Sequence, residues 1–327
     1  MIHIRAVSTE TALLFYNKCM KTSYDTTAFA KINLFLRCCG KYDNGYHRLY
    51  MLMQQIGIGD DILMEFDDGK GFGIELESGV GIPPEKDLGY RAAKAFYDAY
   101  DEKLIREGKL THIFPHTFIK ETKNVPSQAG LGGGSSDAAA VLQILQQHFD
   151  YPLDEETLLA ISSKLGADVP FFLTGGTCIC EGVGQIVTPL PDLAGVRIVL
   201  VKPEEGVSTA QCYELSDETP SVFDEDAYKE KMNKIFGDEK KRPLERIKAA
   251  CPDLTNDLQA PAVKLLPKIT DLINAIKETG AFYTAMTGSG SCVFGLFNDE
   301  KSCKEACSAL EGDPRTSGCQ IIPSVLI

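Results

Sequence analysis

The sequence predicts an α+β protein of two domains. Its 327 residues, 44% of them hydrophobic, are enough for two packed cores and lack the composition of a disordered chain. Strand and helix patterns are segregated along the chain and do not alternate as in a βαβ array. A proline-containing link at residues 188–192 indicates a boundary near residue 190. The expected division is an N-terminal extension over residues 1–26, an N-terminal domain over 27–190 and a C-terminal domain over 191–327.

An antiparallel sheet is expected at the start of the first domain. In residues 28–38 the even positions are apolar, while the odd positions include Lys31 and Asn33, which is typical of a strand with two different faces. A turn at residues 43–45, Asp-Asn-Gly, precedes apolar runs at residues 49–58 and 62–66. The helices expected next cover residues 90–105, residues 138–149, and a segment that Asp154 caps and Gly166 ends.

Shorter elements follow, first at the end of the first domain and then in the second. A strand is expected over residues 169–180, broken by Gly175-Gly176, and another over residues 196–201. A strand pair is expected around residues 287–291. The later helices are expected over residues 224–236, 262–277 and 299–310.

Residues 126–137, PSQAGLGGGSSD, predict a phosphate site at a helix N-terminus. Four glycines in five positions let the backbone approach a ligand closely, and the first helical turn offers unpaired N–H groups to an anion. Ser135 stands where a Walker A loop needs Lys, and the third glycine of the dinucleotide fingerprint is missing. The alternative is a flexible turn capped by Ser135 or Ser136, although consecutive glycines cost conformational entropy.

Charge and cysteine content limit the function classes. A net charge of −13 disfavours nucleic acid and anionic membranes, but helix ends still allow small anionic ligands. No apolar stretch is long enough for a membrane span. Eleven scattered cysteines without C-x-x-C pairs indicate a reduced, cytoplasmic protein. Residues 1–26 lack a clean export signal; an organelle transit peptide and a frayed extension both remain open.

Three residues are candidates for the chemistry of phosphoryl transfer. A kinase acting on an alcohol needs a carboxylate to accept the hydroxyl proton and a cation to offset the charge on the transferred group. Asp168 and Lys31 could form that pair, with Asn33 on the same strand face as Lys31. The alternatives are a solvated strand face for Lys31 and Asn33 and a turn-forming aspartate for Asp168.

Two further segments are weaker candidates. Tyr46-His47 follows a turn, where a ring and a neutral imidazole offer stacking and hydrogen bonds to a flat heterocycle. Residues 287–291, TGSGS, join two apolar runs. A hairpin turn and a second backbone approach to a phosphate are equally open there.

In order along the chain, several motifs resemble those of the GHMP small-molecule kinase superfamily. The glycine loop at residues 129–137 and the segment 287–294 are typical of the superfamily as a whole. More specific motifs are AKINLFL at residues 30–36, NGYH at 44–47, LGADVPFF at 165–172 and EGVG at 181–184. The likeness runs from about Ala28 to the C-terminus.

This resemblance implies a two-domain GHMP-kinase-like fold with the active site in the interdomain cleft. It implies ATP- and Mg²⁺-dependent phosphorylation of the 2-hydroxyl of a cytidine diphosphate-linked methylerythritol, a step of the non-mevalonate isoprenoid pathway, by a monomer or homodimer. Asp168 would be the base and Lys31 its electrostatic partner. Tyr46 would stack on the cytosine and His47 would bond its edge. Residues implied to bind the acceptor substrate are Asn33, Tyr46, His47, Tyr213, Gly288, Ser289 and Gly290.

ATP would be held by the glycine loop. The implied residues are Pro126, Ser127, Gln128, Ala129, Gly130, Leu131, Gly132, Gly133, Gly134, Ser135 and Ser136. The sequence identifies no carboxylate ligand for Mg²⁺, so we expect the ion to be held largely by phosphates, waters and a loop serine such as Ser135. Two departures are that residues 127–129 contain less glycine than the family often has there and that the segment before Ala28 is longer. The rival functions are another kinase of the superfamily, acting on homoserine, a mevalonate derivative or a sugar, and a catalytically silent ligand sensor. The Tyr46-His47 turn favours a substrate with a cytidine head group, which disfavours the other kinases of the superfamily. The presence of Asp168 and Lys31 disfavours a ligand sensor.

Overall fold

The computed structural model describes residues 5–7, 21–79, 81–109 and 114–327. The chain folds into two compact units, each built from separate segments. Unit 1 consists of Met1–Phe29, Gly59–Val125 and Gly133–Leu173, and unit 2 of Ala30–Ile58, Pro126–Gly132 and Thr174–Ile327. Most of the expected extension, residues 1–4 and 8–20, lies outside the described residues. The division into consecutive domains at residue 190 stays a prediction.

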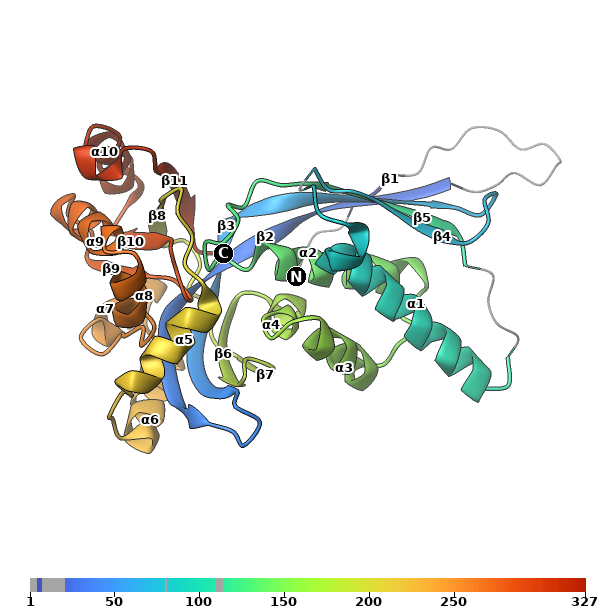
Figure 1. The fold of residues 1–327 in the computed structure, drawn as a ribbon, viewed down its shortest axis with the longest axis horizontal. Coiled ribbons are helices and arrows are strands. Elements are labelled where there is room, and N and C mark those ends of the chain that lie inside the picture. Colours follow the sequence, from blue (N-terminus) through green and yellow to red (C-terminus); the bar gives the residue numbers. More distant parts are fainter. Residues whose placement is uncertain (1–4, 8–20, 80, 110–113) are drawn as a thin grey trace. The chain divides into compact units, whose positions relative to one another are not determined.

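Unit 1 is a sheet with helices packed on one face (Figure 1). Its strand order is β1-β2-β3-β5-β4, and β4 is parallel to β5. The unit contains the start of β2 and the end of β3, both of which continue into unit 2. The strands are β1 (Arg5–Val7), β2 (Lys21–Lys41), β3 (His47–Asp67), β4 (Gly73–Glu77) and β5 (His116–Thr122).

The helices of unit 1 begin where the sequence supplies capping side chains. Asp87 accepts hydrogen bonds from the amides of Gly89 and Tyr90, and Asp154 accepts one from Thr157. A short 3₁₀ turn, Pro84–Lys86, precedes α1, and α1 packs on α2 and α3. The helices are α1 (Leu88–Arg106), α2 (Gly133–His148), α3 (Glu155–Leu165) and α4 (Val169–Thr174), whose last residue is assigned to unit 2.

An aromatic cluster fills the core of unit 1. His148 stacks on Phe66 with the ring centroids 3.7 Å apart and the planes 7° from parallel. Tyr24 and Phe149 contact the same two rings at their edges. Burial lowers the pKa of His148 to about 4, so this imidazole is a neutral core ring at neutral pH.

Unit 2 contains the remainder of β2 and β3 and a separate four-stranded antiparallel sheet. β3 pairs with β6 (Thr177–Gly182), and β6 pairs with β7 (Ile186–Pro189). The second sheet has the order β11-β8-β10-β9, formed by β8 (Arg197–Lys202), β9 (Tyr283–Met286), β10 (Val293–Phe297) and β11 (Gln320–Val325). The sheet positions the β9–β10 turn, which belongs to the candidate site.

Six helices of unit 2 surround these strands. They are α5 (Thr209–Glu218), α6 (Glu225–Phe236), α7 (Pro243–Ala250), α8 (Gln259–Leu265), α9 (Lys268–Glu278) and α10 (Glu300–Glu311), followed by the 3₁₀ turn Pro314–Thr316. α9 and α10 pack on the four-stranded sheet. Ser208 caps α5, and Asp224 caps α6.

Most of the predicted elements are confirmed. The strand pattern at residues 28–38 lies in β2, and the runs 49–58 and 62–66 form one long strand, β3. The helices predicted at 90–105, 224–236 and 299–310 correspond to α1, α6 and α10. The predicted strand pair around residues 287–291 is the β9–β10 hairpin.

Two predicted elements are wrong in part, and each error falls at a proline. The strand predicted at residues 169–180 is helix α4 followed by β6, because Pro170 is compatible with a first helical turn and a short apolar run does not distinguish helix from strand. The single helix predicted at 262–277 is two helices, α8 and α9. Leu266 adopts φ −139° and ψ 86° before Pro267, as expected for a residue that proline disfavours in the helical region.

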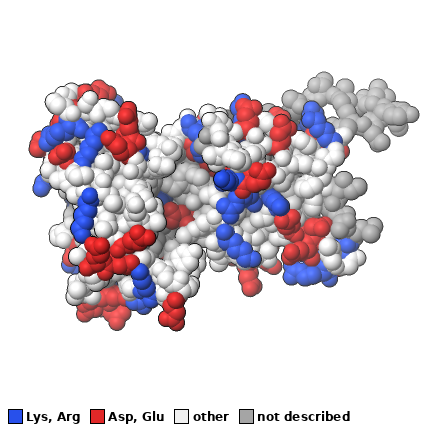
Figure 2. Space-filling model, in the orientation of Figure 1, with Lys and Arg blue, Asp and Glu red and all other residues white. Residues whose placement is uncertain are grey.

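The surface carries mixed charge. On the face shown in Figure 2, Lys and Arg side chains are interspersed with Asp and Glu. Oppositely charged side chains of the protein form ion pairs; Arg315, for example, pairs with Asp313 and Glu278, both at 2.6 Å. Among the described residues, none of the helices has both the length and the apolar character that a membrane span requires.

Candidate active site

The glycine loop has the backbone conformation that its composition predicts. Gly130 and Gly132 have φ of +73° and +74°, a region that residues with a side chain rarely adopt. A Cβ atom on Gly130 would lie 2.3 Å from the carbonyl oxygen of Thr287. The Lys31 amide donates to the carbonyl of Leu131 at 2.9 Å. The loop of unit 2, residues 126–132, is thus held against β2 and residue 287.

Helix α2 begins at Gly133, five residues before the predicted start at residue 138, so residues 133–137 of the predicted loop form its first turn. The hydroxyl of Ser136 donates to the carbonyl oxygen of Gly133 at 2.7 Å and is thereby turned back onto its own helix. Gly166 lies next to Ser135: a Cβ atom on Gly166 would be 3.6 Å from the Ser135 hydroxyl oxygen. Within unit 1, the segment that carries Asp168 therefore starts beside the first turn of α2.

Lys31 and Asn33 are buried polar residues of β2, exposed by only 4% and 1%. The Lys31 ammonium donates to the Asn33 side-chain oxygen at 2.6 Å, and the backbone N–H of Asn33 donates to the Thr287 hydroxyl at 3.0 Å. The Thr287 hydroxyl in turn donates to the carbonyl of Gly130 at 3.4 Å. The alternative of a solvated strand face is therefore wrong, because burying a lysine requires such partners.

The β9–β10 turn lies against the glycine loop. Gly288 has φ +57°, and a Cβ atom there would lie 3.2 Å from the Gly130 Cα. Ser289 and Thr209 hydrogen bond through their hydroxyls at 2.7 Å, and Gly290 has φ +87°. The hairpin turn is confirmed, and its Gly288 adjoins Gly130 of the loop within unit 2.

Asn256 holds this turn and was missed by the sequence reasoning. It is 8% exposed, and its side-chain amide donates to the carbonyls of Met286 and Gly288, both at 2.8 Å. The available signal was a polar residue two positions from each of Leu254 and Leu258, which are both buried. That pattern is common in loops and does not identify a partner.

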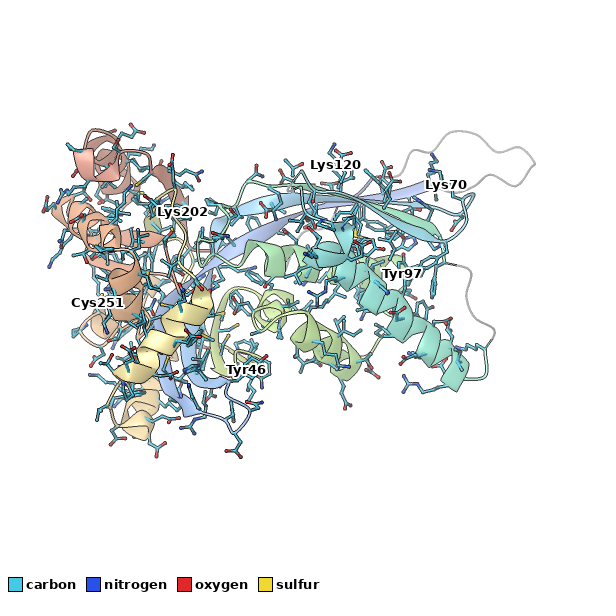
Figure 3. All side chains as sticks on the ribbon, in the orientation of Figure 1. Tyr46, Lys70, Tyr97, Lys120, Lys202 and Cys251 are labelled. Atoms are coloured by element: carbon cyan, nitrogen blue, oxygen red, sulfur yellow. The ribbon has the colours of Figure 1, made fainter. Side chains whose placement is uncertain are left out.

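Tyr46, His47 and Tyr213 all belong to unit 2, and two of them touch. The rings of His47 and Tyr213 are stacked with centroids 4.5 Å apart and planes 27° from parallel. Tyr46, labelled in Figure 3, is 64% exposed at the turn between β2 and β3. Stacking between Tyr46 and a ligand stays a prediction.

Asp217, also missed, binds the His47 ring. Its Oδ1 lies 2.8 Å from His47 Nε2, and its Oδ2 accepts from the Lys41 ammonium at 2.5 Å. Partial burial would raise the pKa of Asp217, but the hydrogen bonds from Lys41 and His47 lower it. His47, Lys41 and Asp217 line a cavity of about 60 Å³ that also reaches Cys38.

Asp168 is half-buried in the segment between α3 and α4 of unit 1. Lys31 belongs to unit 2, so the pairing of Asp168 with Lys31 stays a prediction. Ser135 as a magnesium ligand also stays a prediction. Within the part of the chain that the structure describes, no three His, Cys, Asp or Glu residues are grouped as a metal site.

A buried charge cluster stands at the entry to the glycine loop. The Lys123 ammonium forms ion pairs with Asp60 on β3 and with Asp137 in the first turn of α2. Asp60 also accepts from the amides of Asn124 and Val125, at 2.5 and 2.7 Å. These bonds position the two residues that precede the loop.

Asp137 of this cluster and the neighbouring Glu121 have raised pKa values. Burial raises the pKa of Asp137 to about 7; the Lys123 ammonium lowers it and Asp60 raises it. Burial, then the charges of Asp137 and Asp87, raise the pKa of the neighbouring Glu121 to about 8. Glu121 is thus largely protonated at neutral pH.

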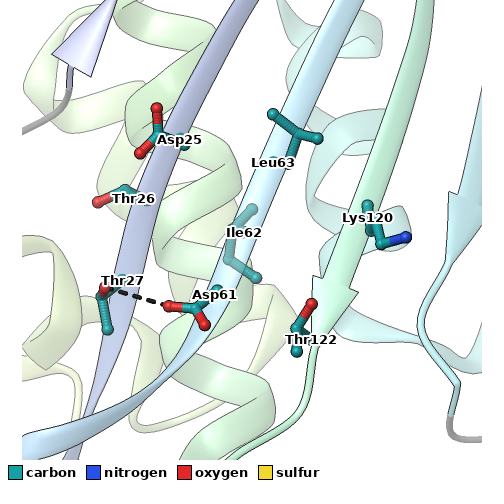
Figure 4. Close-up of a pocket in the computed structure, with 8 residues that line it drawn as sticks. All are labelled: Asp25, Thr26, Thr27, Asp61, Ile62, Leu63, Lys120 and Thr122. Atoms are coloured by element: carbon teal, nitrogen blue, oxygen red, sulfur yellow. Dashed lines mark hydrogen bonds between the residues drawn. The ribbon is translucent and has the colours of Figure 1, made fainter.

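Unit 1 also has an open groove on its sheet (Figure 4). Its volume is about 390 Å³, and Thr27 donates to Asp61 within it at 3.3 Å. The remaining lining residues are Asp25, Thr26, Ile62, Leu63, Lys120 and Thr122. None of the predicted site residues lines it.

Comparisons with known proteins agree with the motif order. Residues 87–176 match the GHMP kinases N terminal domain, and residues 240–313 match the GHMP kinases C terminal domain. A 4-diphosphocytidyl-2-C-methyl-D-erythritol kinase of Clostridium botulinum is 37% identical over 84% of this chain and 91% of its own length. The chain belongs to this kinase family. The enzyme of the same name from Desulfitobacterium hafniense is 38% identical over 88% of this chain and 91% of its own length.

Solved structures confirm the α+β fold of this family member. A crystal structure of 4-(cytidine 5'-diphospho)-2C-methyl-D-erythritol kinase matches with a TM-score of 0.69 and 28% identity, over 92% of this chain and 98% of that one. A homoserine kinase from Cytophaga hutchinsonii matches with a TM-score of 0.63 at 18% identity, over 96% and 97%. The second match supports the fold alone.

Proposed function

We propose that the protein transfers the γ-phosphoryl group of ATP to the 2-hydroxyl of 4-diphosphocytidyl-2-C-methyl-D-erythritol, in the non-mevalonate isoprenoid pathway. The observation that carries this proposal is its kinship, at 37% and 38% identity over most of the chain, with kinases named for that substrate. The buried Lys31–Asn33–Thr287 chain beside the glycine loop supports it, because phosphoryl transfer depends on positioned donors and a fixed cation.

The proposed chemistry is an in-line displacement. Asp168 accepts the proton of the substrate's 2-hydroxyl while the oxygen of that hydroxyl forms a bond to the γ-phosphorus. The bond from that phosphorus to the bridging oxygen breaks, and ADP leaves with the electron pair. The Lys31 ammonium offsets negative charge on the transferring group. The expected location of these groups in an interdomain cleft stays part of the proposal.

The ATP phosphates would be bound by the glycine loop, residues 126–132, and the first residues of α2. The glycines at positions 130 and 132 support this assignment: they have no Cβ atom, which permits their positive φ values and lets a phosphate approach the backbone N–H groups closely. Mg²⁺, when bound, would offset phosphate charge. A serine hydroxyl such as that of Ser135 is compatible with an ion held mainly by phosphates and water.

The cytidine head group would be bound by the Tyr46-His47 turn and Tyr213. The stacked pair of His47 and Tyr213 supports this assignment, because it presents a flat aromatic surface with a hydrogen-bonding edge. Asn33 and the backbone of residues 288–290 would contact the rest of the acceptor.

The test is ADP release by the purified protein with MgATP and four separate acceptors. These are the diphosphocytidyl methylerythritol, homoserine, phosphomevalonate and galactose. We expect turnover with the first alone, with the 2-phosphate identified by phosphorus NMR. Turnover with another acceptor would overturn the substrate assignment but keep the kinase chemistry. Binding of ATP without turnover of any acceptor would favour a ligand sensor.

A further inference from the structure

The hydrogen bonds around His47 fix which of its ring nitrogens carries the proton. A neutral imidazole has one donor nitrogen and one acceptor nitrogen. Asp217 Oδ1 lies 2.8 Å from His47 Nε2, and an ionised carboxylate only accepts hydrogen bonds. In the neutral ring Nε2 therefore carries the proton, and Nδ1 is left as an acceptor.

Lys41 holds the Asp217 carboxylate in place as an acceptor for His47. Its ammonium donates to Oδ2 of Asp217 at 2.5 Å, so the carboxylate is held between two donors. The lowered pKa of Asp217 keeps it ionised at neutral pH. The carboxylate therefore stays an acceptor toward His47 throughout the neutral range.

Helix α5 fixes this arrangement beside the stacking ring. Tyr213 and Asp217 are four residues apart on α5, so they lie on one face of the helix. His47 stacks on Tyr213 and bonds Asp217 at the same time. One helix thus sets both the plane and the proton position of the imidazole.

We propose that Asp217 is a positioning residue that makes His47 selective for cytosine over uracil. The proposal rests on the assignment of His47 to the base edge under the proposed function. Cytosine presents its N4 amino group as a donor where uracil presents O4 as an acceptor. An acceptor at His47 Nδ1 matches the first and opposes the second, and leaving a polar group unmatched in a binding site weakens binding strongly.

Two substitutions of Asp217 are expected to act differently. Asp217→Ala removes the acceptor, so His47 can take either proton position. In Asp217→Asn, Lys41 attracts the amide oxygen, and the amide nitrogen then donates to Nε2, which moves the imidazole proton to Nδ1. Selectivity for cytosine over uracil should therefore be highest in the unmodified protein, lower in Asp217→Ala and lowest in Asp217→Asn.

The experiment compares kcat/KM for the cytidine substrate and for the matching uridine-diphosphate compound. We expect the ratio to fall about tenfold in Asp217→Ala and more in Asp217→Asn, with the KM for ATP unchanged. Glu214→Gln is the matched control, since it removes one exposed carboxylate from the same helix. A ratio that is unchanged in both Asp217 variants would overturn the proposal while the proposed function stands.

A second measurement does not need turnover. Nitrogen-15 NMR of the His47 ring in the full-length protein at pH 8 reports which nitrogen carries the proton. We expect a protonated Nε2 in the unmodified protein and in Glu214→Gln, and a protonated Nδ1 in Asp217→Asn. A protonated Nδ1 in the unmodified protein would overturn the proposal. If neither nucleotide compound is turned over, the proposed function fails, and this spectrum still decides the effect of Asp217 on His47.

Discussion

Carboxylates in the two units respond to their surroundings in opposite directions. In unit 1, burial raises the pKa of Asp137 to about 7 and that of Glu121 to about 8, although Lys123 lies beside Asp137. In unit 2, Asp217 keeps about a third of its side chain exposed, and hydrogen bonds from Lys41 and His47 lower its pKa. Desolvation dominates the first case and hydrogen bonding the second.

The difference matches the roles proposed for the two units. Unit 1 carries the proposed base, Asp168, and fixes the entry to the glycine loop through buried charge. Unit 2 carries the residues proposed to recognise the cytidine head group, which need access to solvent and ligand. Substitutions in unit 1 should therefore affect turnover and stability, and those in the turn of unit 2 should affect acceptor binding.

The largest effect is expected for Asp168→Asn. A general base acts in the transition state more than in binding, so kcat should fall by about 10² to 10⁴ while ATP affinity stays nearly unchanged. Steady-state kinetics and ATP titration of the same preparation measure the two quantities. Unchanged turnover would exclude the role of Asp168 as base.

Lys123→Met should cost about 3 kcal/mol in the free energy of unfolding at pH 7. Removing the cation leaves Asp60 and Asp137 buried without their ionic partner. The expected loss is at the lower end of the range for breaking a buried ion pair, because the Lys123 side chain is 26% exposed. Urea unfolding measures it. Lys120→Met is the control, since the Lys120 side chain is 44% exposed and pairs with the exposed Glu77. Equal losses in both variants would mean that burial of the cluster contributes nothing.

Glu121 should make the stability of the protein depend on pH. Its pKa is raised from 4.5 to about 8 in the folded state. At pH values between these two, the folded state therefore binds more protons than the unfolded state. Its stabilising contribution is complete below about pH 4.5 and is lost as the pH rises through about 8. Glu121→Gln should remove its own part of the slope, leaving the part due to Asp137, and stabilise the protein at pH 8 by about 4 kcal/mol.

Urea unfolding at pH 5, 6.5 and 8 measures this slope. Glu77→Gln, at a side chain that is 59% exposed, should leave it as it is in the unmodified protein. A Glu121→Gln slope equal to that of the unmodified protein would show that Glu121 does not carry the raised pKa.

The smallest effect is expected for Tyr46→Ala. Loss of stacking on the cytosine should weaken the diphosphocytidyl substrate by about 1 to 2 kcal/mol, within the range for a base on an aromatic ring. ATP binding should not change. Tyr42→Ala is the control, because Tyr42 is a second exposed tyrosine of the same turn. Equal weakening of ATP and acceptor would contradict a role confined to the base.

Sequence reasoning was most reliable where the signal is local. The glycines at positions 130 and 132, the cap Asp154 and the pattern of β2 are set by near neighbours, and the structure agrees with these predictions. Proline positions were read less well, since Pro170 lies in a helix and Pro267 divides one. A short apolar run such as the one around Pro170 has no periodicity that distinguishes a helix from a strand.

The contacts that assemble the site come from residues distant in sequence, which no local pattern predicts. Gly130 meets Thr287, Asn256 holds Gly288, and Asp217 bonds His47 across 170 positions. Asp60 and Lys123 each look like an ordinary surface residue in the sequence, and only the fold brings them together. The roles of Asp168, Lys31 and Ser135 stay predictions.

The interleaving of the two units has a consequence for any attempt to dissect the protein. The chain passes between them at residues 29/30, 58/59, 125/126, 132/133 and 173/174. A single cut in the gene therefore cannot yield either unit as one contiguous fragment. The seven-residue glycine loop is itself an insertion of unit 2 between two segments of unit 1, so a domain-swap chimera with another kinase would have to exchange the loop together with residues far downstream.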